Sequence, residues 1–362
     1  MSVSELQVQT ALKDLIDPNT QKDFITSKSA RSIKVEGGNV TLDVVLPYPA
    51  KMVQGQIKAM VEDKVRTVEG VTGVTANVTW KVVAHSVQRG VKLIPGVKNI
   101  IAVASGKGGV GKSTTAVNLA LALSAEGAKV GMLDADIYGP SQPTMLGIHG
   151  RPESPDGQNL EPMVGHGLQA MSIGFLIDVE TPMVWRGPMV TQALEQLLNN
   201  TKWNDLDYLV VDLPPGTGDI QLTLAQRVPV TGAVIVTTPQ DIALIDARKG
   251  LKMFEKVGVP ILGIVENMSL HICSKCGHEE RIFGEGGGQQ MCKDYGVEFL
   301  GGLPLDIRIR EETDSGKPTV VAEPESRIAE IYRQIGRRVA VKVGDLAVDH
   351  SSKFPSIVIQ NT

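Results

Sequence analysis

The first part of the chain alternates between helical and extended patterns of hydrophobic residues. Five segments carry such a pattern: a helix near 4–15, alternating strands around 33–35 and 40–44, a helix from 53 to 68 and an alternating strand from 74 to 83. Gly37-Gly38-Asn39, between the first two strands, predicts a hairpin turn. The pattern therefore predicts a small α/β domain of residues 1–84 with the element order αββαβ.

From Asn99 onward, short and continuously apolar runs alternate with helical patterns. These runs are IIAVAS, KVGMLD, YLVVD, AVIVTT, ILGIVE and FLGGLP, and each closes near Gly, Pro or Asp. Uninterrupted apolar strands are typical of a parallel sheet that helices cover on both faces. Such sheets bind ligands at the carboxyl ends of their strands, where the polar motifs of this chain lie. We predict a linker at 85–98, a second domain at 99–345 and a loosely ordered polar tail at 346–362.

Composition narrows the class of protein. The chain has 362 residues, of which 42% are hydrophobic and 21% charged, enough for one large core and a smaller second one. Its net charge of -4 and the absence of a long basic run in the sequence argue against nucleic acid as a partner. The N-terminus has no secretory signal, and no stretch of the sequence reaches the roughly 18 apolar residues of a membrane span. A cytoplasmic protein without a membrane partner is expected.

The segment after the run IIAVAS has the spelling of a phosphate-binding loop. It fits G-x-x-x-x-G-K-[ST] and precedes a helical pattern, as that motif requires. We expect its backbone N–H groups to cradle the phosphates of ATP, Lys112 to contact the β- and γ-phosphates, and Ser113 to ligate Mg²⁺. The predicted ATP-binding residues of the loop are Gly106, Lys107, Gly108, Gly109, Val110, Gly111, Lys112, Ser113 and Thr114.

A dinucleotide site is the competing interpretation of this loop. Three of its glycines also spell G-x-G-x-x-G, and Asp134 and Asp136 lie where a dinucleotide fold keeps an acid for the ribose. A second apolar strand that ends in an acid favours ATP, because Asp212 is suited to hold Mg²⁺ and Gly216 offers a backbone N–H near a γ-phosphate. The sequence therefore favours a P-loop ATPase over an NAD(P)-dependent enzyme.

Three cysteines are too few for a disulfide framework, and two of them, Cys273 and Cys276, have the C-x-x-C spacing of a metal knuckle. Two thiolates supply only half of a four-ligand site. In one interpretation, His278 and Cys292 complete a zinc site within one chain. In the other, a second copy of the chain brings another C-x-x-C pair, and four thiolates suit zinc or a 4Fe-4S cluster. The chemistry of the residues leaves both interpretations open.

KGGVGKST resembles the deviant Walker A loop of the group that includes MinD, ParA, the nitrogenase iron protein and Mrp. In that group the early lysine, here Lys107, reaches across a nucleotide sandwich dimer and stabilises charge in trans. The resemblance implies that Asp136 positions or activates the attacking water and that Asp134 supports Mg²⁺ and the switch geometry, although either carboxylate also suits a helix cap. It implies that Asn267, otherwise a turn asparagine, hydrogen-bonds adenine, which Pro304 and Asp306 flank.

The motifs and the resemblance together predict the catalytic residues and the magnesium ligands. The expected catalytic residues are Lys107, Lys112, Asp136 and Asp212, and the expected magnesium ligands are Ser113, Asp134 and Asp212.

Motifs along nearly the whole chain resemble the Mrp/ApbC-type iron-sulfur cluster carriers. GKGGVGKST, DADIYGPS, WRGPM, DLPPGTGD, ENMS, C-x-x-C and DSGKP occur in the order of that family. The resemblance implies a homodimer in which paired Cys273 and Cys276 hold a labile 4Fe-4S cluster for apo iron-sulfur proteins, together with cluster assembly factors. It favours the cluster over zinc and leaves Cys292 as a core thiol. The N-terminal unit is similar to a small domain of other iron-sulfur assembly factors but has no cysteine, so we assign it no cofactor.

Two regulatory switch ATPases are the alternatives. A MinD-like regulator with a structural zinc site requires an amphipathic terminal membrane helix, and the terminal SIVIQNT is too short and too uncharged for one. A ParA-like partition ATPase requires a basic, DNA-binding surface. Neither regulatory activity by itself explains C-x-x-C, which in either alternative would be a structural zinc site. The sequence thus predicts an α/β P-loop NTPase with a mostly parallel sheet, which hydrolyses ATP slowly and carries an iron-sulfur cluster.

Overall fold

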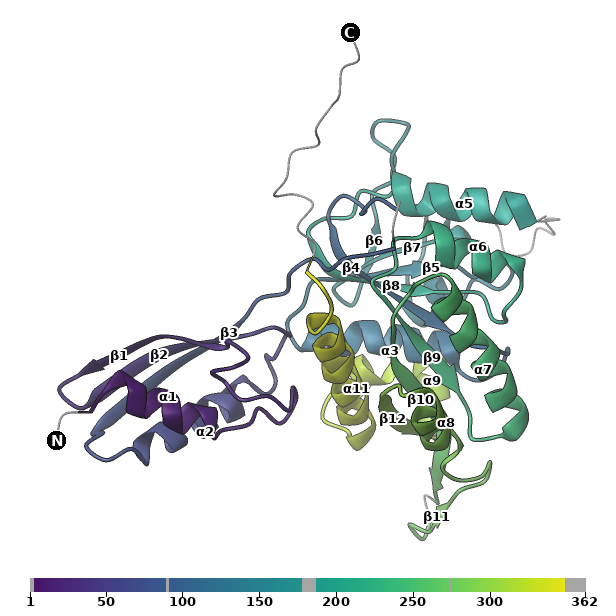
Figure 1. Cartoon of the computed structure of the whole chain (residues 1–362). Coiled ribbons are helices and arrows are strands. Elements are labelled where there is room, and N and C mark those ends of the chain that lie inside the picture. Colours follow the sequence, from purple (N-terminus) through teal and green to yellow (C-terminus); the bar gives the residue numbers. More distant parts are fainter. Residues whose placement is uncertain (1–2, 89–90, 178–186, 274, 349–362) are drawn as a thin grey trace.

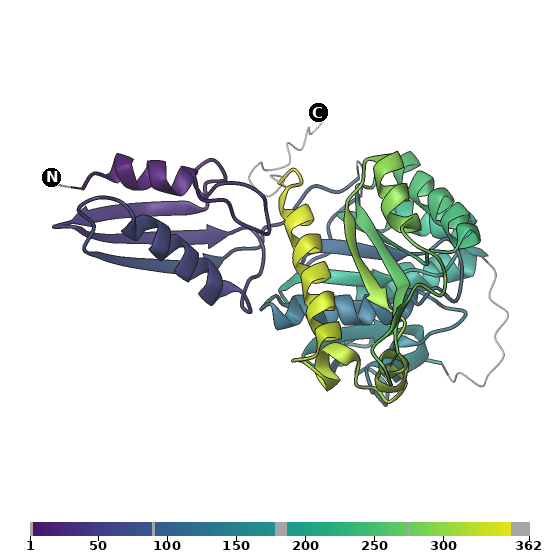
Figure 2. The ribbon, with the colours of Figure 1, turned by 90° about the horizontal axis from the view of Figure 1, so that it is seen from below.

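The computed structural model describes residues 3–88, 91–177, 187–273 and 275–348. These residues form a three-stranded sheet and a separate nine-stranded sheet. The small sheet and its two helices stand beside α3 and α11 of the larger unit in both views (Figures 1 and 2). Within the described ranges, every helix is too short or too polar to cross a membrane.

The small unit confirms the predicted order αββαβ. Its elements are α1 (Glu5–Lys13), β1 (Ala30–Glu36), β2 (Asn39–Leu46), α2 (Gln54–Arg66) and β3 (Gly73–Trp80). Strand β2 pairs with β1 in the antiparallel and with β3 in the parallel direction. Val40, Leu42, Val44 and Leu46 alternate with more exposed residues and are buried, because successive side chains of a strand point to opposite faces. The buried face packs against both helices.

The larger sheet runs in the order β11-β10-β9-β4-β8-β5-β7-β6, with β12 paired to β10. Its strands are β4 (Val97–Ala104), β5 (Val130–Asp134), β6 (Met163–Gly165), β7 (Leu168–Ser172), β8 (Leu206–Asp212), β9 (Gly232–Thr237), β10 (Ile261–Ile272), β11 (Glu279–Glu280) and β12 (Phe299–Pro304). Apart from the β6–β7 and β10–β11 pairs, the pairings are parallel. The prediction of a mostly parallel sheet is confirmed.

Helices cover both faces of this sheet (Figures 1 and 2). On one face lie α3 (Lys112–Ala125), α10 (Thr319–Ala322) and α11 (Arg327–Gly344), and on the other lie α5 (Gly187–Asn200), α6 (Asp219–Arg227), α7 (Asp241–Lys256) and α8 (Gly287–Tyr295). The short α4 (Gln142–Met145) contacts α3 and α9 (Ile307–Asp314), and a 3₁₀ turn spans Ile173–Phe175. The phosphate-loop helix α3 is therefore buried between sheet and α11.

Two features of the sheet differ from the expected strands. The hydrophobic pattern of the sequence did not predict the hairpin of β6 and β7. His166 and Gly167 at its turn have φ values of 48° and 81°, as a two-residue hairpin turn requires. Strand β10 continues beyond Glu266 to Ile272, because Leu270 pairs with Pro304 of β12 and the strand end pairs with β11. Asn267 consequently lies inside a strand and not after one.

A buried polar contact joins the small unit to the far end of α3. Glu126, directly after this helix, forms an ion pair with Arg337 of α11, and its side chain is fully buried. Its Oε2 accepts the N–H of Met52 at 3.1 Å, and its carbonyl accepts the N–H of Lys51 at 2.9 Å. The end of the phosphate-loop helix is thus also an anchor for the N-terminal unit.

Candidate functional site

The predicted phosphate loop connects the central strand β4 to the N-terminus of α3. Gly111 has φ of 80°, a conformation that favours glycine, and a Cβ there would collide with the Asn267 amide. At Gly106 a Cβ would collide with the backbone of Asp246 in α7. Lys107, Gly108 and Gly109 are exposed. An exposed glycine loop at a helix N-terminus, where backbone N–H groups and the helix dipole favour anions, suits phosphate.

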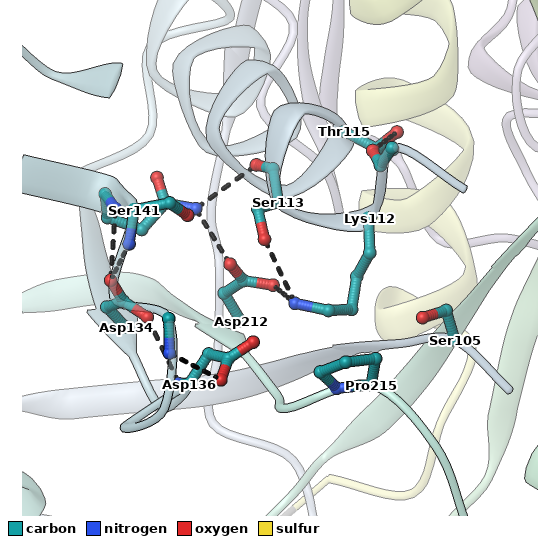
Figure 3. A network of polar contacts seen from close by, with 12 residues as sticks. Ser105, Lys112, Ser113, Thr115, Asp134, Asp136, Ser141, Asp212 and Pro215 are labelled. Carbon is teal, nitrogen blue, oxygen red and sulfur yellow. Dashed lines mark hydrogen bonds and ion pairs between the residues drawn. The ribbon is translucent and has the colours of Figure 1, made fainter. Parts of the chain in front are cut away.

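Lys112 and two acids meet beneath this loop (Figure 3). Asp134 and Asp212 are register partners at the carboxyl ends of β5 and β8, and both are fully buried. The ammonium of Lys112 forms an ion pair with Asp212 and lies 3.1 Å from the Ser113 hydroxyl. The structure therefore brings together four of the residues that the sequence singled out.

Asp134 supports the segment that follows it. Its Oδ2 accepts hydrogen bonds from the N–H groups of Ser141 and Gln142 at 2.9 and 3.0 Å and from the Ser172 hydroxyl at 3.1 Å. It therefore acts at the start of α4 as a helix cap does. Burial, with the neighbouring charge of Asp212, raises the pKa of Asp134 to about 7.

Asp136 is half-buried beside the same segment, and Oδ1 of its carboxylate accepts the Gly139 N–H at 3.3 Å. Burial raises its pKa above the usual range. A carboxyl group at the edge of a phosphate site with a raised pKa is suited to hold or accept a proton there.

The residues around Asp212 fit a magnesium ion. They present hard oxygen donors, which Mg²⁺ prefers, and when both buried carboxyl groups are ionised they carry one more charge than Lys112 neutralises. Among the described residues, the buried Ser141 Oγ and Gln142 Oε1 have no hydrogen-bond partner. A hydrated divalent cation supplies both the missing positive charge and water donors to such oxygens. Ser113 and Asp212 are the side chains best placed to hold it, with Asp134 behind them.

Magnesium affinity is expected to depend on pH through Asp134. Its carboxyl group is largely protonated below about pH 7 in the folded chain, and a cation competes with that proton. In the presence of ADP, the apparent affinity for Mg²⁺ should therefore rise between about pH 6 and about pH 8, with proton release. Calorimetry in two buffers of different ionisation enthalpy measures this release. An unchanged pH dependence in Asp134→Asn would show that another group carries it.

Gln142 was missed by the sequence analysis. Its Nε2 donates to Oδ2 of Asp212 at 2.9 Å and to the carbonyl of Ser113 at 3.2 Å, and its side chain is buried. Ser172, which contacts Asp134 from β7, was missed as well. The only signal for Gln142 was its place three residues after Gly139 in the switch-like segment, and Ser172 had none, because its contact depends on the pairing of β7 with β5.

Two predicted nucleotide contacts are engaged within the chain itself. The N–H of Gly216 donates to the Ser105 carbonyl at 2.9 Å, so a bond to a γ-phosphate requires this pair to separate. The Asn267 amide donates from Nδ2 to the carbonyl of Val110 in the phosphate loop at 2.9 Å. Its other atom, Oδ1, is the acceptor that an adenine amino group needs. Asn267 thus lies against the loop, and its contact with the base stays a prediction.

Pro304 ends β12, and Asp306 lies between β12 and α9. Both line a cavity of about 530 Å³ between β10, β12 and the start of α11. The Asp306 carboxylate caps α9 and holds the Arg308 guanidinium at 3.0 and 2.8 Å. The hydrogen bond from Arg308 lowers the pKa of Asp306.

The C-x-x-C pair lies at the tip of the β10–β11 hairpin, which extends from the sheet (Figure 1). The N–H of Cys273 donates to the His278 carbonyl at 2.9 Å, and the N–H of Gly277 donates to the Cys273 carbonyl at 2.8 Å, which closes a knuckle. Cys273 is half-buried and Cys276 exposed. Backbone N–H groups of Lys275 and Cys276 hold the pKa of Cys273 below its usual value, which favours the thiolate.

The zinc site within one chain is not supported. Cys292 is buried in α8 as a core thiol, and burial raises its pKa to about 12. Over the part of the chain that the structure describes, no group of three or more His, Cys, Asp or Glu residues could hold a metal ion. A metal held by the paired cysteines would therefore need ligands from outside the described residues.

Comparison with known proteins adds family relationships. Residues 96–340 match the model of the NUBPL iron-transfer P-loop NTPase family, and residues 5–78 match a model described as iron-sulfur cluster assembly protein. The chain is 52% identical to the iron-sulfur cluster carrier protein of Haemophilus influenzae, over 93% of this chain and 91% of the relative. It is also 52% identical to the iron-sulfur cluster transfer protein NUBPL of Mus musculus, over 68% of this chain and 78% of that protein.

Among solved structures, the chain is similar to the nucleotide-binding protein of Archaeoglobus fulgidus in complex with ADP. The identity is 39% and the TM-score 0.56, with 64% of this chain and 90% of that chain covered. The match confirms the P-loop fold of the larger unit.

Proposed function

Because this chain belongs to the NUBPL iron-transfer P-loop NTPase family, which includes the iron-sulfur cluster carrier proteins, we propose that it hydrolyses ATP as a cytoplasmic homodimer and carries a 4Fe-4S cluster to apoproteins. The cluster is cargo, held by Cys273 and Cys276 of both copies. We further propose the division into a small domain at 1–84, a linker at 85–98, the ATPase domain at 99–345 and a tail at 346–362. Of that tail, residues 349–362 lie outside the described part, as do Trp185 and Arg186 of the WRGPM motif.

The observation that carries the proposal is the course of β10. At Asn267 this strand contacts the phosphate loop, and Cys273 follows its end directly. Six residues of fully extended chain span about 20 Å at 3.3 Å each, and the left-handed Met268, with φ of 56°, and a register irregularity interrupt the strand between Glu266 and Leu270. A single kinked strand therefore runs between the proposed nucleotide site and the proposed cargo site, which supports a carrier that couples the two.

In the proposed hydrolysis, the phosphate loop holds ATP and Lys112 moves from Asp212 to the β- and γ-phosphates. A water oxygen forms a bond to the γ-phosphorus while the bond from that phosphorus to the bridging oxygen breaks, and ADP and phosphate result. Asp136 orients the water and receives its proton. Ser113 and Asp212 would hold Mg²⁺, which when bound would neutralise phosphate charge. Lys107, exposed at the loop, reaches the phosphates of the partner copy.

Iron and sulfide analysis tests whether the chain carries a 4Fe-4S cluster. After anaerobic reconstitution with iron and sulfide, we expect the wild-type chain to hold about one 4Fe-4S cluster per dimer, because four thiolates complete such a site. In the double variant Cys273→Ala/Cys276→Ala, the iron and sulfide content should fall to background. The matched control is Cys292→Ala, whose buried thiol lies in the core and which should keep its cluster. Stoichiometric zinc without sulfide in protein purified anaerobically would instead favour a switch ATPase with structural zinc.

A further inference from the structure

One motif, DSGKP at residues 314–318, takes no part in the proposed hydrolysis, yet it lies against the short helix α4. The motif begins at the last residue of α9 and ends directly before α10. Its Gly316 has φ of 78°, and the N–H groups of Gly316 and Lys317 donate to the carbonyls of Thr313 and Glu312 at 3.1 and 3.0 Å. This is the left-handed turn with which many helices end.

Helix α4 ends in the same kind of turn, and the two turns pack against each other. Gly147, with φ of 62°, follows α4, and its N–H donates to the Thr144 carbonyl at 3.0 Å. A Cβ at Gly316 would lie 2.7 Å from the Cα of Gly147, closer than side chains approach a backbone. His166 Nε2 lies 2.7 Å from the Gly316 carbonyl oxygen and holds this turn from the β6–β7 hairpin. The close contact therefore requires that Gly316 has no side chain.

The position of α4 depends on contacts at both of its ends. A helix of one turn is unstable by itself, so the surroundings decide where it lies. At its N-terminal end, the Asp134 carboxylate accepts the N–H of Gln142 at 3.0 Å, and the Gln142 side chain donates to Asp212 at 2.9 Å. At its C-terminal end lies the turn of Gly316. A displacement of that end would move Gln142 relative to both carboxylates.

The other end of the motif leads to the phosphate-loop helix α3. In α10, the Val320 N–H donates to Oδ1 of the fully buried Asn118 of α3 at 3.1 Å. The Nδ2 atom of Asn118 donates to the carbonyl of Thr114, the last residue of the predicted phosphate loop, at 3.0 Å. The segment from Gly316 to Val320 thus lies between two fixed points, one on α4 and one on α3.

From this arrangement we propose that the DSGKP segment is a spacer between α4 and α3, and that Gly316 is a positioning residue for the acidic side of the phosphate site. The inference rests on the proposed function, since it assigns a residue to the proposed hydrolysis. Gly316 touches no reacting atom and acts through α4. When α4 is displaced, Gln142 no longer holds Asp212 and Asp134 loses a donor, whereas the phosphate loop keeps its contact with Asn267.

Gly316→Ala in the full chain tests this role, because the added Cβ must displace the backbone of Gly147. The rate of hydrolysis at saturating ATP should fall about tenfold or more, since a misplacement of about 1 Å can cost about 100-fold. The affinity for ADP without magnesium, measured by calorimetry, should change less than about twofold. Amide hydrogen exchange over residues 137–146 should become about tenfold faster or more, because α4 loses its C-terminal support.

Gly296→Ala is the matched control. Gly296 also follows a helix in the left-handed conformation, with φ of 64°, but a Cβ there would have open space among the described residues. Alanine meets the same kind of backbone strain at both positions and a close neighbour only at Gly316. The control should keep the rate of hydrolysis and the exchange of residues 137–146 within about twofold of wild type.

Gly147→Ala is a milder second variant in case Gly316→Ala does not fold. Its Cβ would lie 3.1 Å from the Gly316 carbonyl oxygen, and it should cause the same changes to a smaller extent. Unchanged exchange of residues 137–146 in both variants would overturn the inference, and so would equal effects in Gly296→Ala. Absence of ATP hydrolysis in the wild-type chain would overturn the proposed function, while the exchange of α4 would still decide whether Gly316 positions it.

Discussion

ATP hydrolysis is expected to fall by about 100- to 1,000-fold when Lys112 is replaced with glutamine, the typical loss when a donor to developing transition-state charge is removed. Lys112 is the buried cation of the site, with its side chain 5% exposed. Glutamine keeps a hydrogen-bond donor for Asp212 but lacks the charge. Affinity for ATP should fall as well, because the ammonium attracts the phosphates before and during reaction. Steady-state phosphate release and calorimetric titration with ADP measure the two effects.

Lys107→Ala is the matched control for this change. Its side chain is exposed, so removing it should leave the fold and the affinity for ADP nearly unchanged. If Lys107 acts in the nucleotide site of the partner copy, its loss should lower the rate of ATP hydrolysis and leave the affinity for ADP unchanged. Mixing this variant with a second one that retains Lys107 but lacks Asp136 should then restore part of the activity. Equal loss of ADP affinity in both lysine variants would refute the separate roles.

The Lys112→Gln variant also tests whether ATP hydrolysis is coupled to cluster delivery. If nucleotide state changes how the cysteines hold the cluster, Lys112→Gln loaded with cluster should not respond to ATP when it meets an apo-acceptor. The rate of acceptor reconstitution, followed by absorption, is the measurement. A variant that still delivers faster with ATP would show that hydrolysis and delivery are separate.

Removing Arg337 is expected to destabilise the chain by about 3 to 5 kcal/mol, the usual cost of breaking a buried ion pair at one partner. In Arg337→Ala, Glu126 stays buried with its charge unpaired, and burial already raises the pKa of Glu126 even beside the arginine. Lys51 and Met52 are hydrogen-bonded to the same residue. The small unit should therefore loosen from α3, which urea unfolding and cleavage near residues 85–98 can detect.

Glu330→Ala provides the comparison for Arg337→Ala. Glu330 also contacts Arg337, at 2.7 Å, and it contacts Arg333 at 3.0 Å, but its side chain is 39% exposed. Solvent screens pairs of this kind, and the loss should cost at most about 1 kcal/mol for each pair. Similar costs for the two variants would show that burial of Glu126 does not govern the contact.

Much of the fold followed from local patterns. Alternating Val and Leu in β2 and the apolar runs of β4, β5, β8, β9 and β12 predicted strands, because burial on one or both faces leaves a period in the sequence. The β6–β7 hairpin was not predicted, since β6 has only three residues and β7 has no continuous apolar run. The extension of β10 was not predicted because it depends on pairing with β12, which lies much further along the chain. Gln142 was missed because its role depends on contacts with the distant residues Asp212 and Ser113.

The sequence by itself determined the phosphate loop, the two acidic strand ends and the cysteine pair. Each of these depends on the spacing of neighbouring residues, and a turn or a strand end is a local structure. Tertiary structure decided which of these motifs meet. The parallel pairing of β10 with β12 placed Cys273 on the same cavity as Pro304 and Asp306, and the position of α11 buried Glu126 against the N-terminal unit. Contacts between distant segments arise from packing, and packing is a property of the whole core and not of any short stretch of chain.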